Sequence, residues 1–367
     1  MASPQRLTWD TASIADVSSG ELSSVLSPVL AESSALLALS ALSASSHGAI
    51  CAAAEAEVDT EAGAEAEKQA GKLGGRSTCN RRMWQLDDFE LGQCIGSGTF
   101  GRVLLARERR SGTVVVLKAM KKRRIERLRV QRHVAHEIEI QAHLRHPNIL
   151  QLFGFFWDAT HIFMIVERAR NGDLGQMLQK QPGQRFEERS AATFVAQIAS
   201  AVEYCHRMHV IHRDVKPQNV LIGHRRKAKL ADFGWAVHTY PDQQRWTLCG
   251  TLDYLPPEMV HASHGHSFGV DIWGLGILSY ELLMGQPPFA APACEETYRR
   301  ILEAKPAFPE KGSHAVSAAA QDFVTALLQR EAADRLRPAA VLAHPWLRQL
   351  LHDSGSESRS GAALAGA

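Results

Sequence analysis

The sequence predicts an α+β protein of two lobes: a small lobe with a five-stranded antiparallel sheet and one main helix, then a mainly helical large lobe. Residues 83–168 contain short runs of alternating apolar and polar residues, rich in β-branched side chains and separated by Gly turns. This pattern is typical of antiparallel strands. From Leu174 onward, apolar residues recur at every third or fourth position, as in packed helices. We therefore predict a small lobe over 83–168 and a large lobe over 169–351.

The two ends of the chain differ from these lobes in composition. Residues 1–82 are dominated by Ala, Ser, Glu and Gly, with few aromatic or β-branched residues. Such a segment buries too little apolar surface to offset the entropy of ordering, so we predict a mostly disordered arm. This arm leans acidic, whereas the remainder of the chain is basic. Residues 352–367 are typical of a flexible tail.

The composition excludes several classes of protein. The chain has 367 residues, 45% of them hydrophobic, and a net charge of only +2, so it is not typical of a nucleic-acid binder. Its six cysteines form no CxxC pair, which argues against a zinc site and a disulfide framework. It has no run of eighteen apolar residues, so we expect no membrane span. The acidic start lacks the features of a secretory or organellar address, which leaves the cytoplasm or nucleus.

The first three strands are expected within residues 84–122, with the string GSGTFG at 96–101 between the first two. Its three glycines let backbone amide groups approach a phosphate closely. An ordinary hairpin would also contain glycines, and a dinucleotide site would be followed by a helix. Because a strand, Arg102–Arg107, follows instead, we favour a loop that covers the phosphates of a nucleotide.

A lysine and a glutamate are expected to meet next to this loop. Strand alternation places Lys118 on the same face as Val114 and Val116, and a lysine on an apolar face needs a charged partner. Residues 121–144 have a helical pattern in which Glu137 shares a face with Val134, Ile138 and Gln141. We therefore expect Glu137 to pair with Lys118, while Glu139 faces solvent.

The remaining elements complete both lobes. Strands at 149–156 and 161–167 bring the sheet to five, and a polar link at 167–173 joins the lobes. Helices are expected at 190–209, 267–285, 296–304, 316–330 and 337–350. The apolar helix at 267–285 carries Asp271, a buried carboxylate that must accept hydrogen bonds. Backbone amides of the catalytic loop, within residues 211–234, are the expected donors.

The chemistry is concentrated in IHRDVKPQNVLIGHRRKAKLADFG, residues 211–234. Asp214 can accept the proton of a hydroxyl group, and Lys216 can neutralise charge on a moving phosphate. Asn219 and Asp232 supply the oxygen ligands that Mg²⁺ prefers. The strings HRD–N and DFG at this separation are the signature of protein kinases. Lys118 and Glu137 complete the catalytic set.

A regulatory contact is expected beside this stretch. His212 has the apolar surroundings of a packed, structural histidine. Arg213, next to Asp214, is suited to receive a phosphate. The hypothesis is that phosphorylation of Thr247 pairs it with Arg213 and orders residues 235–258.

From about Trp84 to Leu351 the chain resembles the eukaryotic serine/threonine protein kinases, and it closely resembles the Aurora kinases. The narrowest matches are DFGWAVH at 232–238, TLCGTLDYLPPEM at 247–259 and EIEIQAHLRHPNIL at 137–150. Gln141 adds to the resemblance, because most kinases place an apolar residue one turn after the helix glutamate and Auroras place Gln.

This resemblance implies a bilobal protein-kinase fold, ATP and Mg²⁺ as cofactors, and transfer of phosphate to Ser or Thr of protein substrates. It implies phosphorylation of Thr247, often by the kinase itself, with Arg245 in the basic position that Auroras prefer. The implied ATP-binding residues are Ile95, Gly96, Ser97, Gly98, Thr99, Phe100, Gly101, Val103, Lys118, Glu167, Ala169 and Asp232.

The family also implies mitotic work on chromosomes and spindle, with histone H3-like substrates. It implies an activating partner, of spindle-assembly or inner-centromere type, that docks on the small lobe. We expect location in cytoplasm and nucleus, and on spindle, centrosome or chromosomes in mitosis, without direct binding to nucleic acid or membrane. Gly154 matches the Aurora A-like type, where the B-like type has Asn.

Two features depart from the family pattern. Gln218 replaces the usual Glu, an acidic contact for a substrate arginine, so we expect weaker arginine preference unless Glu281 serves instead. Arg168 stands in the link where Auroras usually carry an aromatic residue. Two alternatives remain: a pseudokinase scaffold, against which the retained catalytic set argues, and a kinase of the Polo or protein-kinase-A type, whose accessory motifs are missing.

Overall fold

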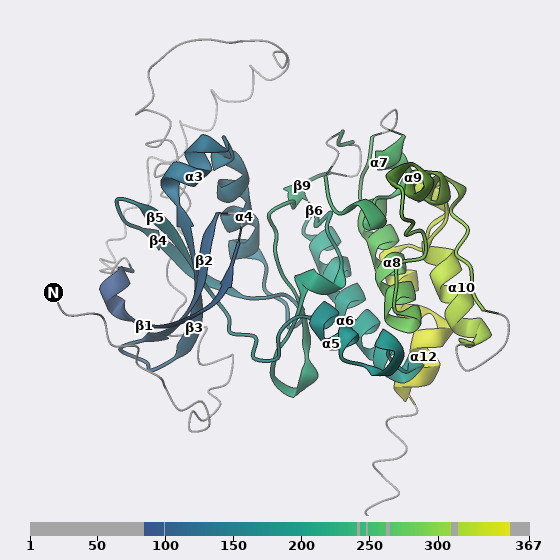
Figure 1. The fold of residues 1–367 in the computed structure, drawn as a ribbon, viewed down its shortest axis with the longest axis horizontal. Coiled ribbons are helices and arrows are strands. Elements are labelled where there is room, and N and C mark those ends of the chain that lie inside the picture. The colour runs from purple at the N-terminus through teal and green to yellow at the C-terminus, as the bar shows by residue number, and fades with distance from the viewer. Residues whose placement is uncertain are drawn as a thin grey trace, which may run out of the picture.

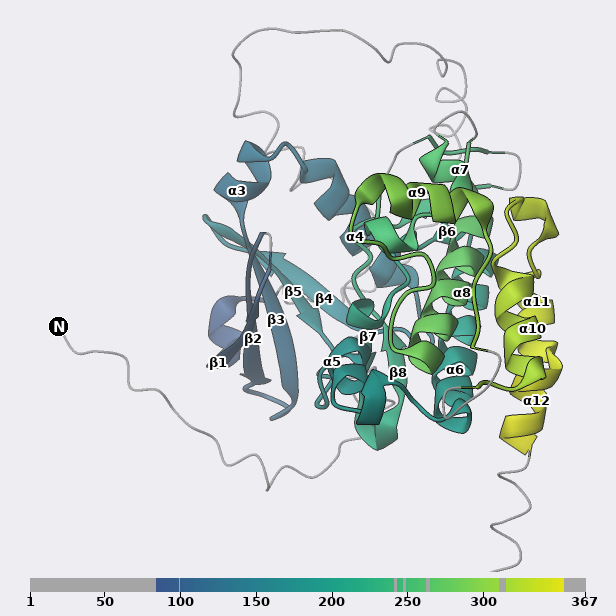
Figure 2. The same cartoon turned by 45° about the vertical axis from the view of Figure 1, so that its right-hand side comes forward.

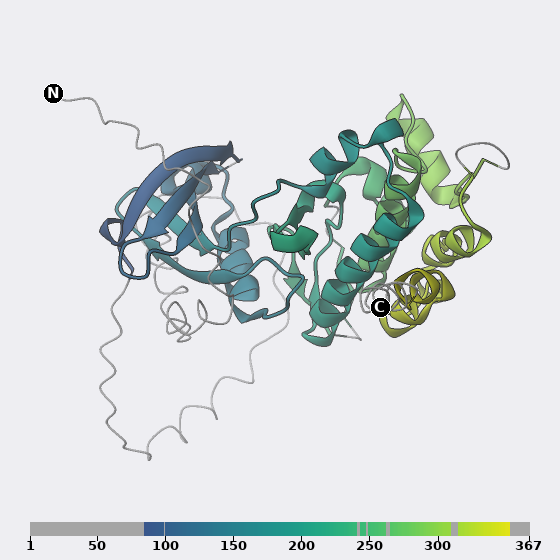
Figure 3. The same ribbon diagram turned by 90° about the horizontal axis from the view of Figure 1, so that it is seen from below.

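The computed structural model describes residues 84–98, 100–240, 243–246, 249–261, 265–309 and 315–352. These residues form two lobes that lie side by side (Figure 1, Figure 3). The predicted arm and, apart from His352, the predicted tail lie outside the described residues. No helix in the described part of the chain is long and apolar enough to cross a membrane.

The small lobe is built on the predicted five-stranded antiparallel sheet, with strand order β1-β2-β3-β5-β4. Its elements are η2 (Leu86–Asp88), β1 (Phe89–Ser97), β2 (Gly101–Glu108), β3 (Val114–Lys121), β4 (Leu152–Trp157) and β5 (His161–Val166). One face of the sheet packs against the main helix, and aromatic residues such as Phe89, Phe156 and Phe163 cover the other. Lys118 therefore stands on the central strand, β3, of a sheet that is packed on both faces.

The helical pattern at 121–144 forms two helices, α3 (Lys122–Arg127) and α4 (Gln131–His143), so the prediction of one continuous helix was wrong. Arg129 adopts a left-handed conformation, with φ of 55°. The amide of Val130 donates to the carbonyl of Ile125 at 3.1 Å, which closes the end of α3. The break lets α4 bury Val134, Ile138 and Gln141 against the sheet while α3 stays largely exposed.

The large lobe packs around α6 (Glu188–Arg207) and α8 (Gly269–Met284), as expected from their apolar spacing (Figure 2). Its other helices are α5 (Leu174–Gln179), η3 (Pro182–Gln184), η4 (Pro217–Asn219), η5 (His224–Arg226), η6 (Leu252–Tyr254), α7 (Pro257–Val260), α9 (Cys294–Glu303), α10 (Ala318–Leu327), η7 (Ala332–Asp334), α11 (Pro338–Ala343) and α12 (Pro345–His352). The predicted helix at 337–350 is split before Pro345, because proline has no backbone N–H group to donate to the preceding turn.

Two short two-stranded antiparallel sheets position the catalytic stretch. β6 (Val210–Ile211) pairs with β9 (Val237–His238), and β7 (Val220–Ile222) pairs with β8 (Ala228–Leu230). The segment 212–219 therefore leaves β6 and enters β7, and Asp232 lies two residues after the end of β8. Leu230 also exchanges backbone hydrogen bonds with Asn148 and Leu150, each at 2.8 Å. These bonds fasten the stretch to the segment that leads into β4 of the small lobe.

Candidate active site

The expected pair between Lys118 and Glu137 is present. The ammonium group of Lys118 on β3 lies 2.6 Å from Oε1 of Glu137 on α4. Burial acts to lower the pKa of Lys118, but Glu137 and Asp232 outweigh it and hold that pKa above its ordinary value. Lys118 therefore stays charged at neutral pH. Its side chain remains 30% exposed, which leaves the ammonium open to an anionic ligand.

Asp214 lies in a compact polar network. Its Oδ2 is 2.7 Å from the ammonium of Lys216 and accepts a hydrogen bond of 2.7 Å from the amide of Asn219. Thr251 donates to its Oδ1 at 3.2 Å and accepts from Lys216 at 2.7 Å. The sequence reasoning missed Thr251, which lies 37 residues beyond Asp214. Its place in TLCGTLDYLPPEM was the only signal. The network fixes the carboxylate while leaving Lys216 partly exposed.

Asp271 holds the backbone of this stretch from below, as predicted. Its carboxylate accepts hydrogen bonds from the backbone amides of His212 at 2.9 Å and Arg213 at 2.7 Å, and lies 2.9 Å from Nε2 of His206. Arg213 has a left-handed φ of 66°, which costs a non-glycine residue about 1 kcal/mol or more. The two bonds to Asp271 offset this strain next to Asp214.

His212 is the packed residue that the sequence predicts. It is fully buried, its Nε2 lies 3.1 Å from the carbonyl of Ala231, and its ring meets that of Phe233 with centroids 4.8 Å apart. Phe233 is likewise fully buried in the large-lobe core. These contacts anchor the chain on both sides of the catalytic loop.

Asp232 turns away from that core. Its φ of 61° is left-handed, its side chain is 56% exposed, and its Oδ1 lies 4.0 Å from the ammonium of Lys118. The amide of Ala231 donates to the carbonyl of Asn219 at 2.8 Å, so the two predicted metal ligands come from adjoining segments. No cluster of three or more His, Cys, Asp or Glu suited to a metal is present in the described residues. A carboxylate and an amide oxygen fit Mg²⁺ that takes its other ligands from phosphates and water.

The glycine-rich loop separates the roles of its glycines. A Cβ on Gly101 would lie 1.8 Å from the carbonyl oxygen of Ala119, so the pairing of β2 with β3 requires this glycine. A Cβ on Gly98 would meet nothing within 4 Å. Gly98 thus has the open space that a phosphate needs, whereas Gly101 serves the sheet. Ile95 is 49% exposed before the loop. Thr99 lies outside the described residues.

The other predicted ATP-binding residues line the same region in different ways. Val103 and Ala169 pack against the buried cluster between the sheet and α4. The carboxylate of Glu167 pairs with Lys229 at 2.8 Å, and Lys229 also donates to the carbonyl of Pro147. The side chain of Glu167 is therefore committed to Lys229, another residue that the sequence reasoning missed, and its backbone amide donates to the carbonyl of Gln151 at 2.9 Å.

The surroundings of Arg213 suit an anion. Thr247 lies outside the described residues, so its predicted pairing with Arg213 stays a prediction. Arg213 donates to the carbonyl of Trp235 at 2.7 Å and lies 3.5 Å from Nε2 of His266. Burial, and then Arg213, lower the pKa of His266 to about 4, so His266 is neutral at pH 7. Nε of Arg245 is buried without a partner in the described part of the chain.

The two residues expected to contact a substrate arginine differ in exposure. Gln218 is exposed beside Gly175. Glu281 is only 9% exposed and accepts a hydrogen bond from the hydroxyl of Tyr254. Burial raises the pKa of Glu281 above its ordinary value, despite that bond. A substrate arginine would have to approach the rim of this buried pair, and contact with either residue stays a prediction.

Comparison with known proteins places this geometry. Residues 89–347 match the family described as the protein kinase domain. The chain is 48% identical over 289 residues to serine/threonine-protein kinase Aurora-1 of Arabidopsis thaliana, covering 79% of this chain and 95% of that protein. It is 45% identical over 281 residues to Aurora kinase B of Mus musculus, covering 77% and 79% of the two chains. It is 46% identical over 267 residues to Aurora kinase A-A of Xenopus laevis, covering 73% and 64%.

Proposed function

The chain belongs to the Aurora family of serine/threonine protein kinases, and from this premise we propose that it phosphorylates Ser and Thr in basic sequence contexts. As a protein serine/threonine kinase it acts on protein substrates, and its family uses ATP and Mg²⁺. The basic context is supported by the retained carboxylate of Glu281, which is 9% exposed. Gln218, in place of an acidic residue, makes that preference weaker than in relatives.

The site's own residues account for phosphoryl transfer. Asp214 orients the substrate hydroxyl and accepts its proton as the oxygen–phosphorus bond forms and the bond to the leaving ADP oxygen breaks. Lys216, 2.7 Å from Asp214, is placed to neutralise charge on the transferred group. Lys118 holds the other phosphates, and Glu137 fixes its position. Bound Mg²⁺ would neutralise phosphate charge, with Asn219 and Asp232 as its protein ligands.

One observation carries this proposal against a pseudokinase scaffold: the Lys118–Glu137 pair and the Asp214 network are both assembled in one structure. Positioning and electrostatic stabilisation supply most of the rate in phosphoryl transfer. A scaffold has no need to hold these groups at hydrogen-bond distance. The buried bonds from Asp271 serve the same positioning.

Regulation by phosphorylation of Thr247 is the next part of the proposal. Arg213 and Arg245 lie close enough to influence each other's environment and that of His266. Neither guanidinium forms an ion pair with a carboxylate in the described residues. A phosphate on Thr247 would supply charge-assisted hydrogen bonds to them. The kinase itself is the proposed source of this phosphate, since Arg245 stands two residues before Thr247.

The cellular part of the proposal follows from the family. We propose mitotic action on chromosomes and spindle, with histone H3-like proteins among the substrates. An activating partner of spindle-assembly or inner-centromere type would dock on the small lobe. Location in cytoplasm and nucleus, and on spindle, centrosome or chromosomes in mitosis, belongs to the same proposal.

The enzyme reading is tested with a pair of variants on α4. Glu137→Gln removes the partner of Lys118, whereas Glu139→Gln changes an exposed carboxylate two residues away. Incubation with Mg²⁺, labelled ATP and a basic histone-type protein should show a loss of about 100-fold or more for Glu137→Gln, as when a preorganised electrostatic contact is removed. Glu139→Gln should match wild type. Label incorporation equal in wild type and Asp232→Asn would sink the proposal.

Phosphosite mapping of the purified protein, followed by Thr247→Ala, tests the regulation. We expect phosphate on Thr247 after incubation with Mg²⁺ and ATP, and a lower kcat for Thr247→Ala on a peptide substrate. Full activity of Thr247→Ala would exclude Thr247 as the regulatory site and leave the kinase activity itself unaffected.

A further inference from the structure

The helix α3 and its flanking turns carry an unusual density of positive charge. Residues 121–132 hold seven basic side chains and one acidic one, Glu126. We call these basic residues the α3 basic patch: Lys121, Lys122, Arg123, Arg124, Arg127, Arg129 and Arg132. All are exposed except Lys122, which is half-buried. Leu128, 46% exposed, lies among them.

The patch has no protein partner in the described part of the chain. None of its seven cations forms an ion pair or a side-chain hydrogen bond with another described residue. Only Ile125 of α3 is fully buried, and α3 lies at the outer edge of the small lobe (Figure 2). Arg123 and Arg127 are one turn apart, and like charges at this spacing destabilise a helix by a few tenths of a kcal/mol. An anionic occupant would remove this repulsion.

The chain itself contains a complementary segment. Residues 55–67, EAEVDTEAGAEAE, hold six carboxylates and no basic residue. Sixteen residues, 68–83, connect this segment to Trp84, where the small lobe begins. At about 3.3 Å per residue these span up to roughly 50 Å. A lobe of this size has a radius of gyration of about 12 Å. The acidic segment can therefore reach any part of the small lobe's surface.

We propose that residues 55–67 dock on the α3 basic patch of the same chain. The attraction is between six carboxylates and seven cations that pair with no side chain in the described part of the chain. A tether of this length gives an effective concentration of order mM, which favours the chain's own segment over a separate acidic protein of similar charge. The docked segment would lie beside the break at 128–130 that leads into α4. It would therefore be next to the helix that supplies Glu137.

A zero-length carbodiimide cross-link in the full chain tests this docking, because it joins a carboxylate to an amine only when the two are in contact. Lys121 and Lys122 are the amines in the patch, and the exposed Lys180 and Lys305 of the large lobe are controls. We expect intrachain links from residues 55–67 to Lys121 or Lys122, and none to the control lysines. The yield should fall at least about fivefold between roughly 50 mM and 500 mM salt, because salt screens exposed charges.

Charge variants identify the occupant. Replacing the six carboxylates of 55–67 by their amides should abolish the links to Lys121 and Lys122. Arg123→Glu with Arg127→Glu should weaken these links. The same double variant should also reduce the protection of the α3 amides from hydrogen exchange, and adding Glu57→Lys and Glu61→Lys to it should restore that protection. Both arginines are exposed and bond to no other described side chain, so the variants should fold, which circular dichroism checks.

Isotope mixing separates this proposal from its alternatives. When labelled and unlabelled chains are mixed before cross-linking, links should join residues of the same chain. Links between chains would mean that a second copy occupies the patch, and would overturn the proposal. Equal linking to patch and control lysines, or no link to the patch at low salt, would also overturn it and leave the patch to a separate anionic partner.

Discussion

Helix α8 carries two buried carboxylates ten residues apart, and their pKa values move in opposite directions. Asp271, in the first turn, is fully buried, and Glu281, in the last turn, is 9% exposed. Burial acts to raise the pKa of each carboxyl group. For Asp271, hydrogen bonds from His206 and His212 outweigh burial and hold the pKa below its ordinary value. For Glu281 the bond from Tyr254 does not outweigh burial, and its pKa is raised.

The difference lies in the donors and in the helix. Asp271 receives two backbone N–H groups and lies against a histidine nitrogen, whereas Glu281 receives one hydroxyl. Asp271 also stands at the positive end of the helix dipole and Glu281 at the negative end. Burial alone therefore does not decide the state of a carboxylate. The surroundings of Asp271 stabilise its charged form, whereas those of Glu281 stabilise its charged form poorly, and an additional cationic partner would improve this.

Asp271→Asn should have the largest effect of the changes that test this contrast. The amide oxygen can replace only part of the anion's hydrogen bonding, and its NH₂ group faces donors. We expect the free energy of unfolding to fall by about 3–5 kcal/mol, as for a broken buried pair. We also expect kcat to fall by about 100-fold or more, since the backbone next to Asp214 loses its anchor. Urea denaturation and steady-state kinetics measure the two effects. Unchanged stability would show that these bonds hold nothing in place.

Glu281→Gln is the matched change at the other end of α8. The amide oxygen still accepts from Tyr254, and the cost of a buried charge is removed. We expect the free energy of unfolding to change by no more than about 1 kcal/mol, towards higher stability. KM for an arginine-containing peptide should rise while kcat stays near wild type. A loss of stability equal to that of Asp271→Asn would contradict the assignment of Glu281 as a poorly stabilised anion.

The pH dependence of stability should sharpen the same contrast. The folded pKa of Glu281 is raised above its ordinary value of 4.5, so the folded state holds this proton more tightly. Stability from this group is present below pH 4.5 and is lost as pH rises through the folded pKa. The folded pKa of Asp271 lies below its ordinary 3.8, so its contribution is full above that value and is lost only as pH falls through the folded pKa.

Urea denaturation of wild type and both variants between pH 4 and pH 8 should show the gain from Glu281→Gln growing with pH. The penalty of Asp271→Asn should stay constant.

Much of this fold follows from local pattern. The strand alternation predicted all five strands. The pattern of 190–209 predicted α6 because its apolar residues recur on one face, and the long apolar run of 267–285 predicted α8, which is buried all round. The break at 128–130 did not follow, because a left-handed Arg129 leaves no mark on an apolar pattern in which Leu128 continues the helical spacing. The sequence also gave no sign that Gly101, rather than Gly98, is required by packing.

The site was predicted where residue type and spacing carry the chemistry. Lys118, Glu137 and Asp271 have the partners that the sequence predicted. Thr251 and Lys229 were missed because their contacts with Asp214 and Glu167 join segments far apart in the sequence. Such contacts depend on how the lobes and the activation segment pack, and no local pattern records that packing.

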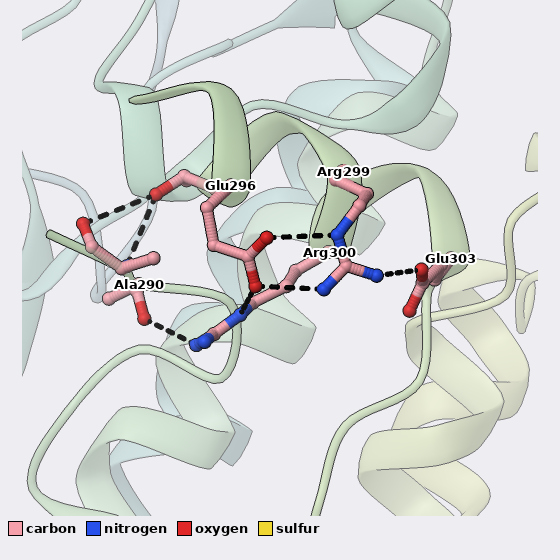
Figure 4. A network of polar contacts seen from close by, with 7 residues as sticks. Ala290, Glu296, Arg299, Arg300 and Glu303 are labelled. Atoms are coloured by element: carbon pink, nitrogen blue, oxygen red, sulfur yellow. Dashed lines mark hydrogen bonds and ion pairs between the residues drawn. The ribbon is translucent and has the colours of Figure 1, made fainter. Parts of the chain in front are cut away.

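An exposed network on α9 provides the smallest expected effect. The carboxylate of Glu296 lies between Arg299 and Arg300, each at 2.8 Å, and Arg300 also donates to the carbonyl of Ala290 (Figure 4). These bonds lower the pKa of Glu296 to about 2, so any stability they give is present above its ordinary value of 4.5 and is lost as pH falls towards 2.

Water and salt screen all three side chains, and exposed ion pairs contribute little. Glu296→Gln should therefore leave the urea midpoint unchanged within error at about 150 mM salt, where exposed charges are screened beyond about 8 Å. A small drop confined to low salt fits this account, whereas a salt-independent loss like that of Asp271→Asn would show that bond number, not burial, sets the value of a charged network.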